Sequence, residues 1–107
     1  MKLQKYVFLL PQAIDRITKR YGMPYLSPSY IFVLYTIQYL PSSCTQQAII
    51  RHAKRLSHTI SPATISLAVN LFIQHELVDI VDGRFSLSPR GREFLSAIRR
   101  YLLNKRL

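Results

Sequence analysis

The sequence contains few of the residues on which dedicated chemistry depends. Its 107 residues include three glycines, one cysteine and no tryptophan, and five acidic side chains stand against fifteen lysines and arginines. A single cysteine, Cys44, excludes an internal disulfide and is typical of a reducing cytoplasm. The five acids are scattered, so they offer no paired carboxylates for general acid–base catalysis. We therefore expect a protein that is not an enzyme and that needs no cofactor.

Metal sites and membrane spans are also missing from the pattern. The longest apolar run, residues 30–37, is far below the ~18 residues of a membrane helix. The run at residues 7–10 is too short for the apolar segment of a signal peptide. Zinc sites use closely paired ligands, and this spacing is absent from the candidates. These candidates are Cys44, His52, His58 and His75. The sequence predicts a soluble, cytoplasmic protein without a metal.

The composition that remains is globular and strongly basic. Hydrophobic residues make up 49% of the chain, which is enough for one modest core, and we expect a single domain over residues 1–107. The net charge is +10 and the isoelectric point is near 10.3. Asp15 is the only acid before Glu76, so most of the basic residues in the first half have no acid to offset them. Such a charge exceeds what solubility requires and favours a polyanionic partner.

Helix caps and one turn predict five helices and a hairpin. Ser27, Ser61 and Ser88 each precede a proline, which is the pattern of a hydroxyl cap followed by proline at the first helical position. Pro11 predicts one more helix start, and residues 1–10 remain open between a helical turn and an extended arm. Asp82-Gly83 predicts a two-residue hairpin turn. The expected helices cover residues 11–22, 27–40, 45–56, 61–75 and 89–104, and the expected strands cover residues 78–81 and 84–87.

The apolar pattern orients these elements. Residues 28–40 are apolar on nearly every side, so we expect this helix to be central and buried. The helix at 45–56 is expected to turn its basic residues outward, together with His52, and to bury a face that includes Leu56. A turn at residues 57–60 leads to the next helix. Its expected inner face is the stripe Ile65, Ala68, Val69 and Phe72. The fold class is therefore mainly α with a small β-hairpin.

From Thr45 to Leu95 the chain resembles the MarR and PadR groups of winged helix-turn-helix transcriptional regulators. The matching segments are Thr45-Gln-Gln with Ile49-Ile50, Ser61-Pro-Ala-Thr-Ile-Ser with Val69 and Phe72, Leu77-Val78, and Phe85-Ser-Leu-Ser-Pro-Arg-Gly-Arg-Glu-Phe-Leu. The resemblance implies that the helix at 61–75 reads DNA sequence. It also implies a homodimer formed by the helices at 11–22 and 89–104. Such relatives have a glycine where this chain has Glu76, which would be costly in a left-handed conformation, so we expect this helix to end differently.

Two sets of residues are candidates for contacts with double-stranded DNA. The base-facing candidates are Ala63, Thr64, Ser66 and Asn70. The phosphate-contacting candidates are Arg51, Lys54, Arg55, Arg84, Arg90 and Arg92. Residues 61–75 contain no lysine or arginine, and the expected wing has a two-residue turn. We therefore expect phosphate contacts to dominate affinity and base contacts to be few.

Leu67 and Leu71 lie where related proteins often have basic residues, and they support a rival hypothesis. If these leucines are exposed, they form an apolar patch of the kind that binds proteins. The chain would then be a winged-helix adaptor that binds a protein partner. RNA binding is a third, weaker alternative, because a basic surface does not by itself distinguish RNA from DNA.

Overall fold

The computed structural model describes residues 2–40, 44–55 and 60–104, with side chains described from residue 9 onward. It contains five helices and one hairpin within these residues. The elements are α1 (Lys2–Arg20), α2 (Pro28–Tyr39), α3 (Gln46–Arg55), α4 (Pro62–Gln74), β1 (Val78–Val81), β2 (Arg84–Leu87) and α5 (Pro89–Asn104). The predicted fold class is confirmed. Residues 57–59 of the expected turn, and the side chains of Leu56 and His58, fall outside the described part of the chain.

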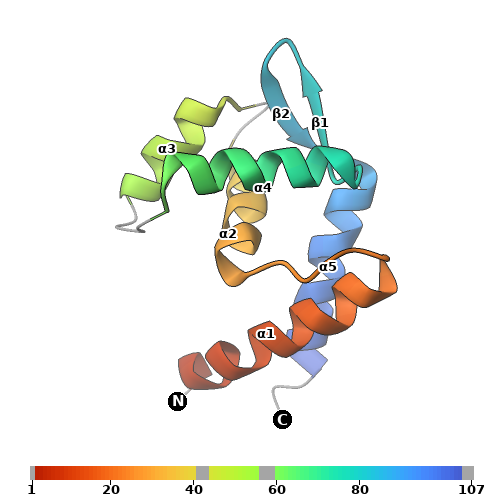
Figure 1. Ribbon diagram of the computed structural model, residues 1–107. Helices are drawn as coiled ribbons and strands as arrows, with labels where there is room; N and C mark the ends of the chain where they lie inside the picture. The colour runs from red at the N-terminus through yellow and green to blue at the C-terminus, as the bar shows by residue number, and fades with distance from the viewer. Residues whose placement is uncertain (1, 41–43, 56–59, 105–107) are drawn as a thin grey trace.

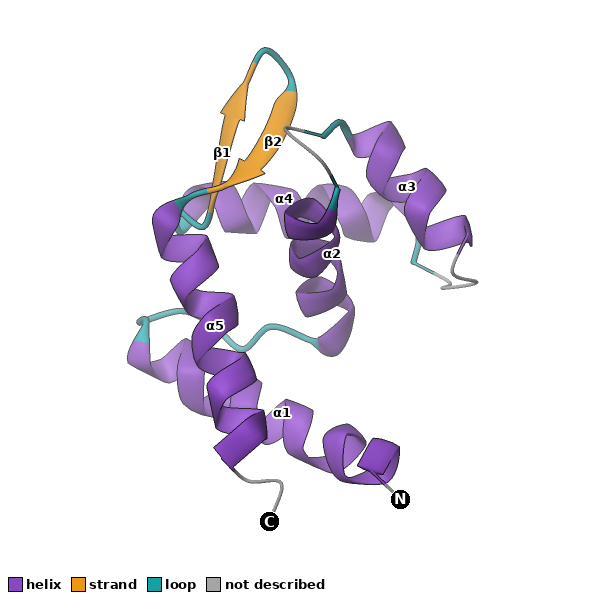
Figure 2. Cartoon of the chain, turned by 180° about the vertical axis from the view of Figure 1, so that it is seen from behind, coloured by secondary structure: helices purple, strands orange, loops and turns teal. Residues whose placement is uncertain are grey.

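Helix α2 is the central element, as its sequence predicted. Figure 2 shows α2 lying between α5 and α3, with α4 behind it. Ser27 caps its first turn by accepting a hydrogen bond from the Tyr30 amide at 3.4 Å, and Pro28 occupies the first helical position. Ile31, Val33 and Leu34 are all at most 2% exposed. Burial of this helix from several sides joins the other helices and the hairpin into one apolar core.

Helix α1 begins earlier than its proline suggested. Pro11 lies inside the helix, so the prediction of a start at this residue was wrong. A proline removes one intrahelical hydrogen bond but does not prevent the helix from continuing when packing supports it. Here the buried stripe Ala13, Ile14 and Ile17 follows the proline directly, and α1 packs against α5. The predicted end at Gly22 is confirmed by its φ of 67° and by the Met23 amide, which donates to the Thr18 carbonyl at 2.9 Å.

Helix α4 ends at a strained residue. We expected Glu76 to avoid the left-handed conformation, and this expectation was wrong, because its φ is 62°. The Leu77 amide donates to the Phe72 carbonyl at 2.8 Å and the Glu76 amide donates to the Ile73 carbonyl at 3.1 Å, which is the glycine-type helix ending. Leu77 is fully buried, so its packing holds the backbone in this conformation despite the side chain of Glu76.

The hairpin agrees with the prediction residue for residue. Asp82 and Gly83 both have positive φ, at 53° and 72°, and Val81 pairs with Arg84 across the turn. The structure adds a bridge that the sequence did not indicate. Cys44 pairs with Phe85, since its amide donates to the Phe85 carbonyl at 2.9 Å and the Phe85 amide donates to the Cys44 carbonyl at 2.6 Å. The segment before α3 therefore anchors the outer edge of β2.

Helix α5 starts close to the end of α4. The Ser88 hydroxyl accepts from the Gly91 amide at 3.0 Å and donates to the Glu76 carbonyl at 2.6 Å. One side chain therefore caps the start of α5 and satisfies a carbonyl just after the end of α4. Gly91 is needed here, because a Cβ atom at this position would overlap the Leu77 carbonyl oxygen. Phe94, Leu95 and Ile98 form the buried face of α5, and each is at most 2% exposed.

The elements divide between two ends of the molecule. Figure 1 shows the hairpin, α3 and α4 at one end, and α1 with the C-terminal half of α5 at the other. Within the described residues, no helix combines the length and the hydropathy needed to cross a bilayer.

Candidate nucleic-acid interface

Helix α4 presents its outer face at the end of the molecule that carries the hairpin. Ser61 caps its first turn by accepting from the Thr64 amide at 3.1 Å, and Pro62 follows the cap. The predicted inner stripe is confirmed: Ile65, Ala68, Val69 and Phe72 are at most 3% exposed. This stripe packs against α2 and α3. The opposite face of α4 therefore remains at the surface. Figure 1 shows α4 running across the front of the molecule.

The predicted base-facing residues are not equally available on this surface. Ala63 and Asn70 are exposed. Thr64 and Ser66 are half-buried, and the Thr64 hydroxyl lies 3.0 Å from the Ser61 hydroxyl, so it takes part in the helix cap. Gln74 is an exposed residue that sequence reasoning missed. Its place on the surface follows from the helical spacing 63, 67, 70 and 74, a signal that the sequence already contained.

The two leucines of the proposed apolar patch have different surroundings. Leu67 is 62% exposed, and it is the most exposed large apolar side chain among the described residues of α4. Leu71 is half-buried and packs against the apolar core. Of the two leucines, Leu67 is therefore exposed and Leu71 is not, so they do not form an exposed pair.

The basic residues of α3 lie next to α4. Arg51, Lys54 and Arg55 are all exposed, and α3 packs against α4. None of the three side chains forms an ion pair or hydrogen bond with another residue in the described ranges. Their charge is therefore available to an anionic partner.

His52 lies on the inner side of α3, which corrects its expected outward position. It is 9% exposed, and its ring stacks on Phe32 with centroids 6.4 Å apart and contacts Tyr39 at 5.2 Å. Its Nδ1 atom is buried and has no hydrogen-bond partner among the described residues. The helical spacing had grouped His52 with the basic residues beside it. The aromatic rings of α2 provide an apolar surface that the imidazole ring of His52 covers.

The hairpin carries less positive charge than its single arginine suggested. The strand register places Arg84 on the same outer face as Asp79, and Asp82 occupies the turn. All three side chains are exposed. Because two acids lie beside one arginine, the hairpin contributes little net attraction for phosphates.

Arg90 is largely engaged within the fold. Its Nε donates to the His75 carbonyl at 3.1 Å and its Nη2 donates to the Tyr21 carbonyl at 3.1 Å, while the guanidinium lies 4.9 Å from the centre of the Tyr21 ring. Tyr21 and His75 directly follow α1 and α4, so one guanidinium satisfies carbonyls at two helix ends. Arg92 also contacts the backbone, because its Nη1 donates to the Leu87 carbonyl at 3.3 Å. Both side chains remain exposed.

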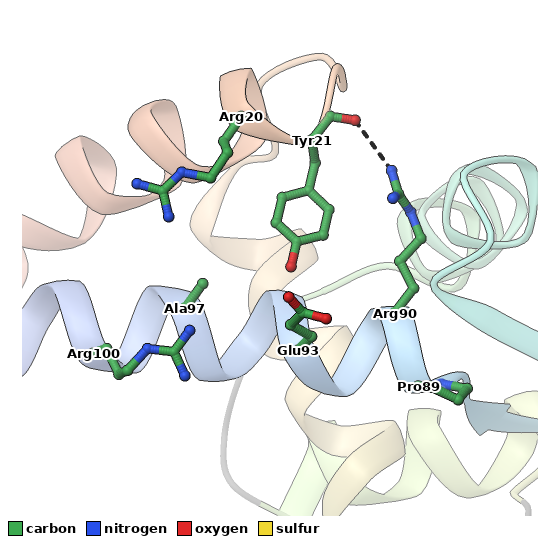
Figure 3. Close-up of a pocket in the computed structure, with 7 residues that line it drawn as sticks. All are labelled: Arg20, Tyr21, Pro89, Arg90, Glu93, Ala97 and Arg100. Atoms are coloured by element: carbon green, nitrogen blue, oxygen red, sulfur yellow. Dashed lines mark hydrogen bonds between the residues drawn. The ribbon is translucent and has the colours of Figure 1, made fainter.

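An open groove of about 530 Å³ lies between the end of α1 and α5. Figure 3 shows Arg20 and Arg100 on its two sides, with the Tyr21 hydroxyl turned toward Glu93. Burial raises the pKa of the Tyr21 hydroxyl, and the negative charge of Glu93 raises it further. The Tyr21 ring also meets Phe94 edge to face at 5.3 Å. The residues of the groove therefore connect α1 to α5.

Candidate metal ligands do not come together in the described part of the chain. No group of three or more histidine, cysteine or acidic side chains has the arrangement to hold an ion there. Cys44 is 4% exposed, and its burial raises the pKa of the thiol.

Comparison with solved structures shows the fold of winged helix-turn-helix proteins. A MarR family transcriptional regulator from Streptomyces coelicolor has a TM-score of 0.65 at 20% identity, over 95% of this chain and 70% of that protein. The ferric uptake regulator of Vibrio cholerae has a TM-score of 0.57 at 18% identity, over 71% of this chain and 62% of that protein. This chain thus matches less than two thirds of the length of the ferric uptake regulator. No family model and no curated protein matches the sequence.

Proposed function

We propose that this chain is a DNA-binding transcriptional regulator that does no catalysis and places α4 in the major groove of double-stranded DNA. The observation that carries the proposal is the uncharged, exposed outer face of α4 beside the unpaired cations of α3. An α-helix fits the B-DNA major groove, and phosphates line both of its edges. The solved proteins of the same fold support this function: one is a transcriptional regulator, and the other is a ferric uptake regulator with DNA-binding domains.

Phosphate contacts supply most of the affinity in this proposal. Arg51, Lys54 and Arg55 contribute from α3, and Arg92 contributes from the start of α5. Arg84 on the hairpin contributes little, because Asp79 and Asp82 lie beside it. Arg90 contributes least, because its guanidinium already donates to two carbonyls. A complex held by about four phosphates per chain loses affinity with a log–log salt slope of about −3.6.

Fluorescence anisotropy with a mixed-sequence duplex at low and moderate salt tests the proposal. Arg55→Ala should weaken every duplex alike and reduce the salt slope by about 0.9. Arg16→Ala is the matched control, since it removes the same charge from an exposed position on α1. Absence of binding at low salt would sink the proposal. An equal effect of both variants would show that net charge, and not the α3 surface, drives binding.

The proposal includes a homodimer formed through α1 and α5. Apolar side chains remain partly exposed at this end of the molecule: Leu9, Leu10 and Leu102 are half-buried, and Leu103 is 43% exposed. Burying them between two chains would remove apolar surface from water. Sedimentation equilibrium should give a dimer for the native chain and a monomer for Leu103→Glu. A native chain that remains monomeric at high concentration contradicts this part.

A winged-helix adaptor is the second candidate, and the exposure of Leu67 favours it. An adaptor would use Leu67 at the centre of a protein contact, with Leu71 at its edge. Replacing both leucines with serine discriminates between the candidates. If self-association is lost while DNA affinity is retained, the adaptor function is favoured. If DNA affinity changes and the oligomeric state does not, the groove-binding function is favoured.

A further inference from the structure

The outer face of α4 carries four side chains in a single row. Ala63, Leu67, Asn70 and Gln74 recur at the spacing of one helical face, and all four are exposed. The row is opposite the buried stripe that contacts α2 and α3. Across its 13 residues, α4 has no acidic or basic side chain. A partner that docks on this face therefore meets two apolar groups followed by two amides.

Each of these groups matches an adenine–thymine base pair. In the major groove, thymine presents a methyl group that apolar side chains contact, and adenine presents the N6 and N7 pair that asparagine and glutamine bind. Guanine is read by arginine or lysine, and cytosine is read by aspartate or glutamate; none of these lies on α4. We propose that α4 reads adenine–thymine pairs, with Leu67 against a thymine methyl group and with Asn70 and Gln74 on adenine.

This inference rests on the proposed function, and the charges beside α4 favour DNA as the occupant. The exposed cations Arg51, Lys54 and Arg55 lie on the adjacent helix, where DNA would supply the phosphates that pair with them. The apolar surface of α4 is also small, since Leu71 is half-buried. A protein interface is typically centred on a larger cluster of buried side chains. A-form RNA is a poor fit, because its major groove is too deep and narrow for side chains to read.

Removal of the thymine methyl group isolates the contact of Leu67. A duplex selected by the native protein from a randomised library would be resynthesised with deoxyuridine in place of each core thymine in turn. This change deletes one methyl group and leaves the base pairing intact. At the contacted position, the native protein should lose about fourfold in affinity. Leu67→Ala should bind the thymine duplex about as weakly as the native protein binds the deoxyuridine duplex. The affinity of this variant should change little when deoxyuridine replaces the thymine.

The amides have a separate test. Asn70→Ala and Gln74→Ala should each lose about tenfold in preference for adenine at one position of the selected site, while their affinity for unrelated duplexes stays the same. Ser96→Ala, at an exposed position of α5, is the control. All of the replaced side chains are exposed, so thermal melting should confirm that every variant is folded.

The outcomes separate this inference from the function on which it rests. If the native protein binds no duplex, the proposed function fails. If it binds duplexes but selects no adenine–thymine positions, or if deoxyuridine substitution has no effect at any position, this inference alone is overturned. If Leu67→Ala abolishes self-association and leaves the selected sequence unchanged, Leu67 serves a protein contact and the inference is again overturned.

Discussion

At the scale of single residues, Glu76 stores strain that a glycine would release. Its φ of 62° brings the Cβ atom close to the following carbonyl, which costs about 1 kcal/mol or somewhat more. Glu76→Gly should therefore raise the free energy of unfolding by about 1 kcal/mol, measured by urea denaturation. Glu76→Ala removes the same carboxylate but keeps the Cβ atom, so it should give no such gain. Equal gains in both variants would attribute the effect to charge and not to the backbone.

Glu76 and His52 show what residue patterns leave unresolved. A pattern indicates a preferred conformation, whereas packing of the neighbouring residue determines the conformation that is adopted. At Glu76 the burial of Leu77 outweighs the backbone preference. The imidazole of His52 packs against the aromatic rings of α2. Helical spacing within α3 could not predict this contact, because it joins two helices.

At the scale of elements, the sequence predicted those helix and strand boundaries that depend on a few adjacent residues. The hairpin turn requires two positive φ angles, and Asp82-Gly83 supplies them, so both strands were predicted to the residue. The Ser-Pro pairs at Ser27 and Ser61 likewise marked true helix starts. Pro11 misled, because a proline at the first position and a proline inside a packed helix share the same local sequence. The bridge between Cys44 and Phe85 joins distant segments without a sequence signal.

Arg90 is predicted to act mainly on the junction of α1, α4 and α5. Arg90→Ala removes charge-assisted hydrogen bonds to the carbonyls of His75 and Tyr21, and the free energy of unfolding should fall by about 1 kcal/mol. For a chain of this size, this loss lowers the melting temperature by about 4–8 °C. Arg99→Ala, an exposed change on the same helix, should melt like the native protein.

Measurement of DNA affinity well below the melting temperature separates a junction role for Arg90 from a phosphate contact. A junction residue lowers the melting temperature and leaves the affinity of the folded protein nearly unchanged. The reverse result, a native melting temperature with weakened binding to all duplexes, would assign Arg90 to the phosphate-contacting set.

At the scale of the whole molecule, the structure predicts a loss of stability in alkali. Burial raises the pKa of Cys44 above its ordinary value of 9.0, and it raises the pKa of Tyr21 and Tyr35 above 10.0. The unfolded chain therefore releases these protons at lower pH than the folded chain. The stability that depends on them is fully present below pH 9 and is lost as the pH rises through the higher folded values.

Urea titrations between neutral pH and pH 11 measure this alkaline loss. The native chain should lose stability progressively above about pH 9. Cys44→Ala should remove the first part of the decline and leave the part due to the tyrosines. A free energy of unfolding that stays constant up to pH 11 would contradict the prediction.

The arrangement of the two ends of the molecule also predicts how a dimer would meet DNA. Helix α4 and the hairpin lie at the end opposite α1 and the C-terminal half of α5 (Figure 1), so pairing through α1 and α5 directs both copies of α4 outward. A two-fold dimer of this kind binds paired half-sites about 34 Å apart on one side of the duplex. An inverted repeat with this spacing should therefore bind more tightly than a single half-site.

Insertion of about half a helical turn between the half-sites tests this geometry, because it moves the second half-site to the opposite side of the duplex. The affinity of the native protein should fall to that for a single half-site. The monomeric variant Leu103→Glu should bind both duplexes equally, since one copy of α4 meets one half-site in each. If the insertion leaves the affinity of the native protein unchanged, the two copies of α4 have no fixed distance between them. Pairing through rigid α1 and α5 would then be excluded.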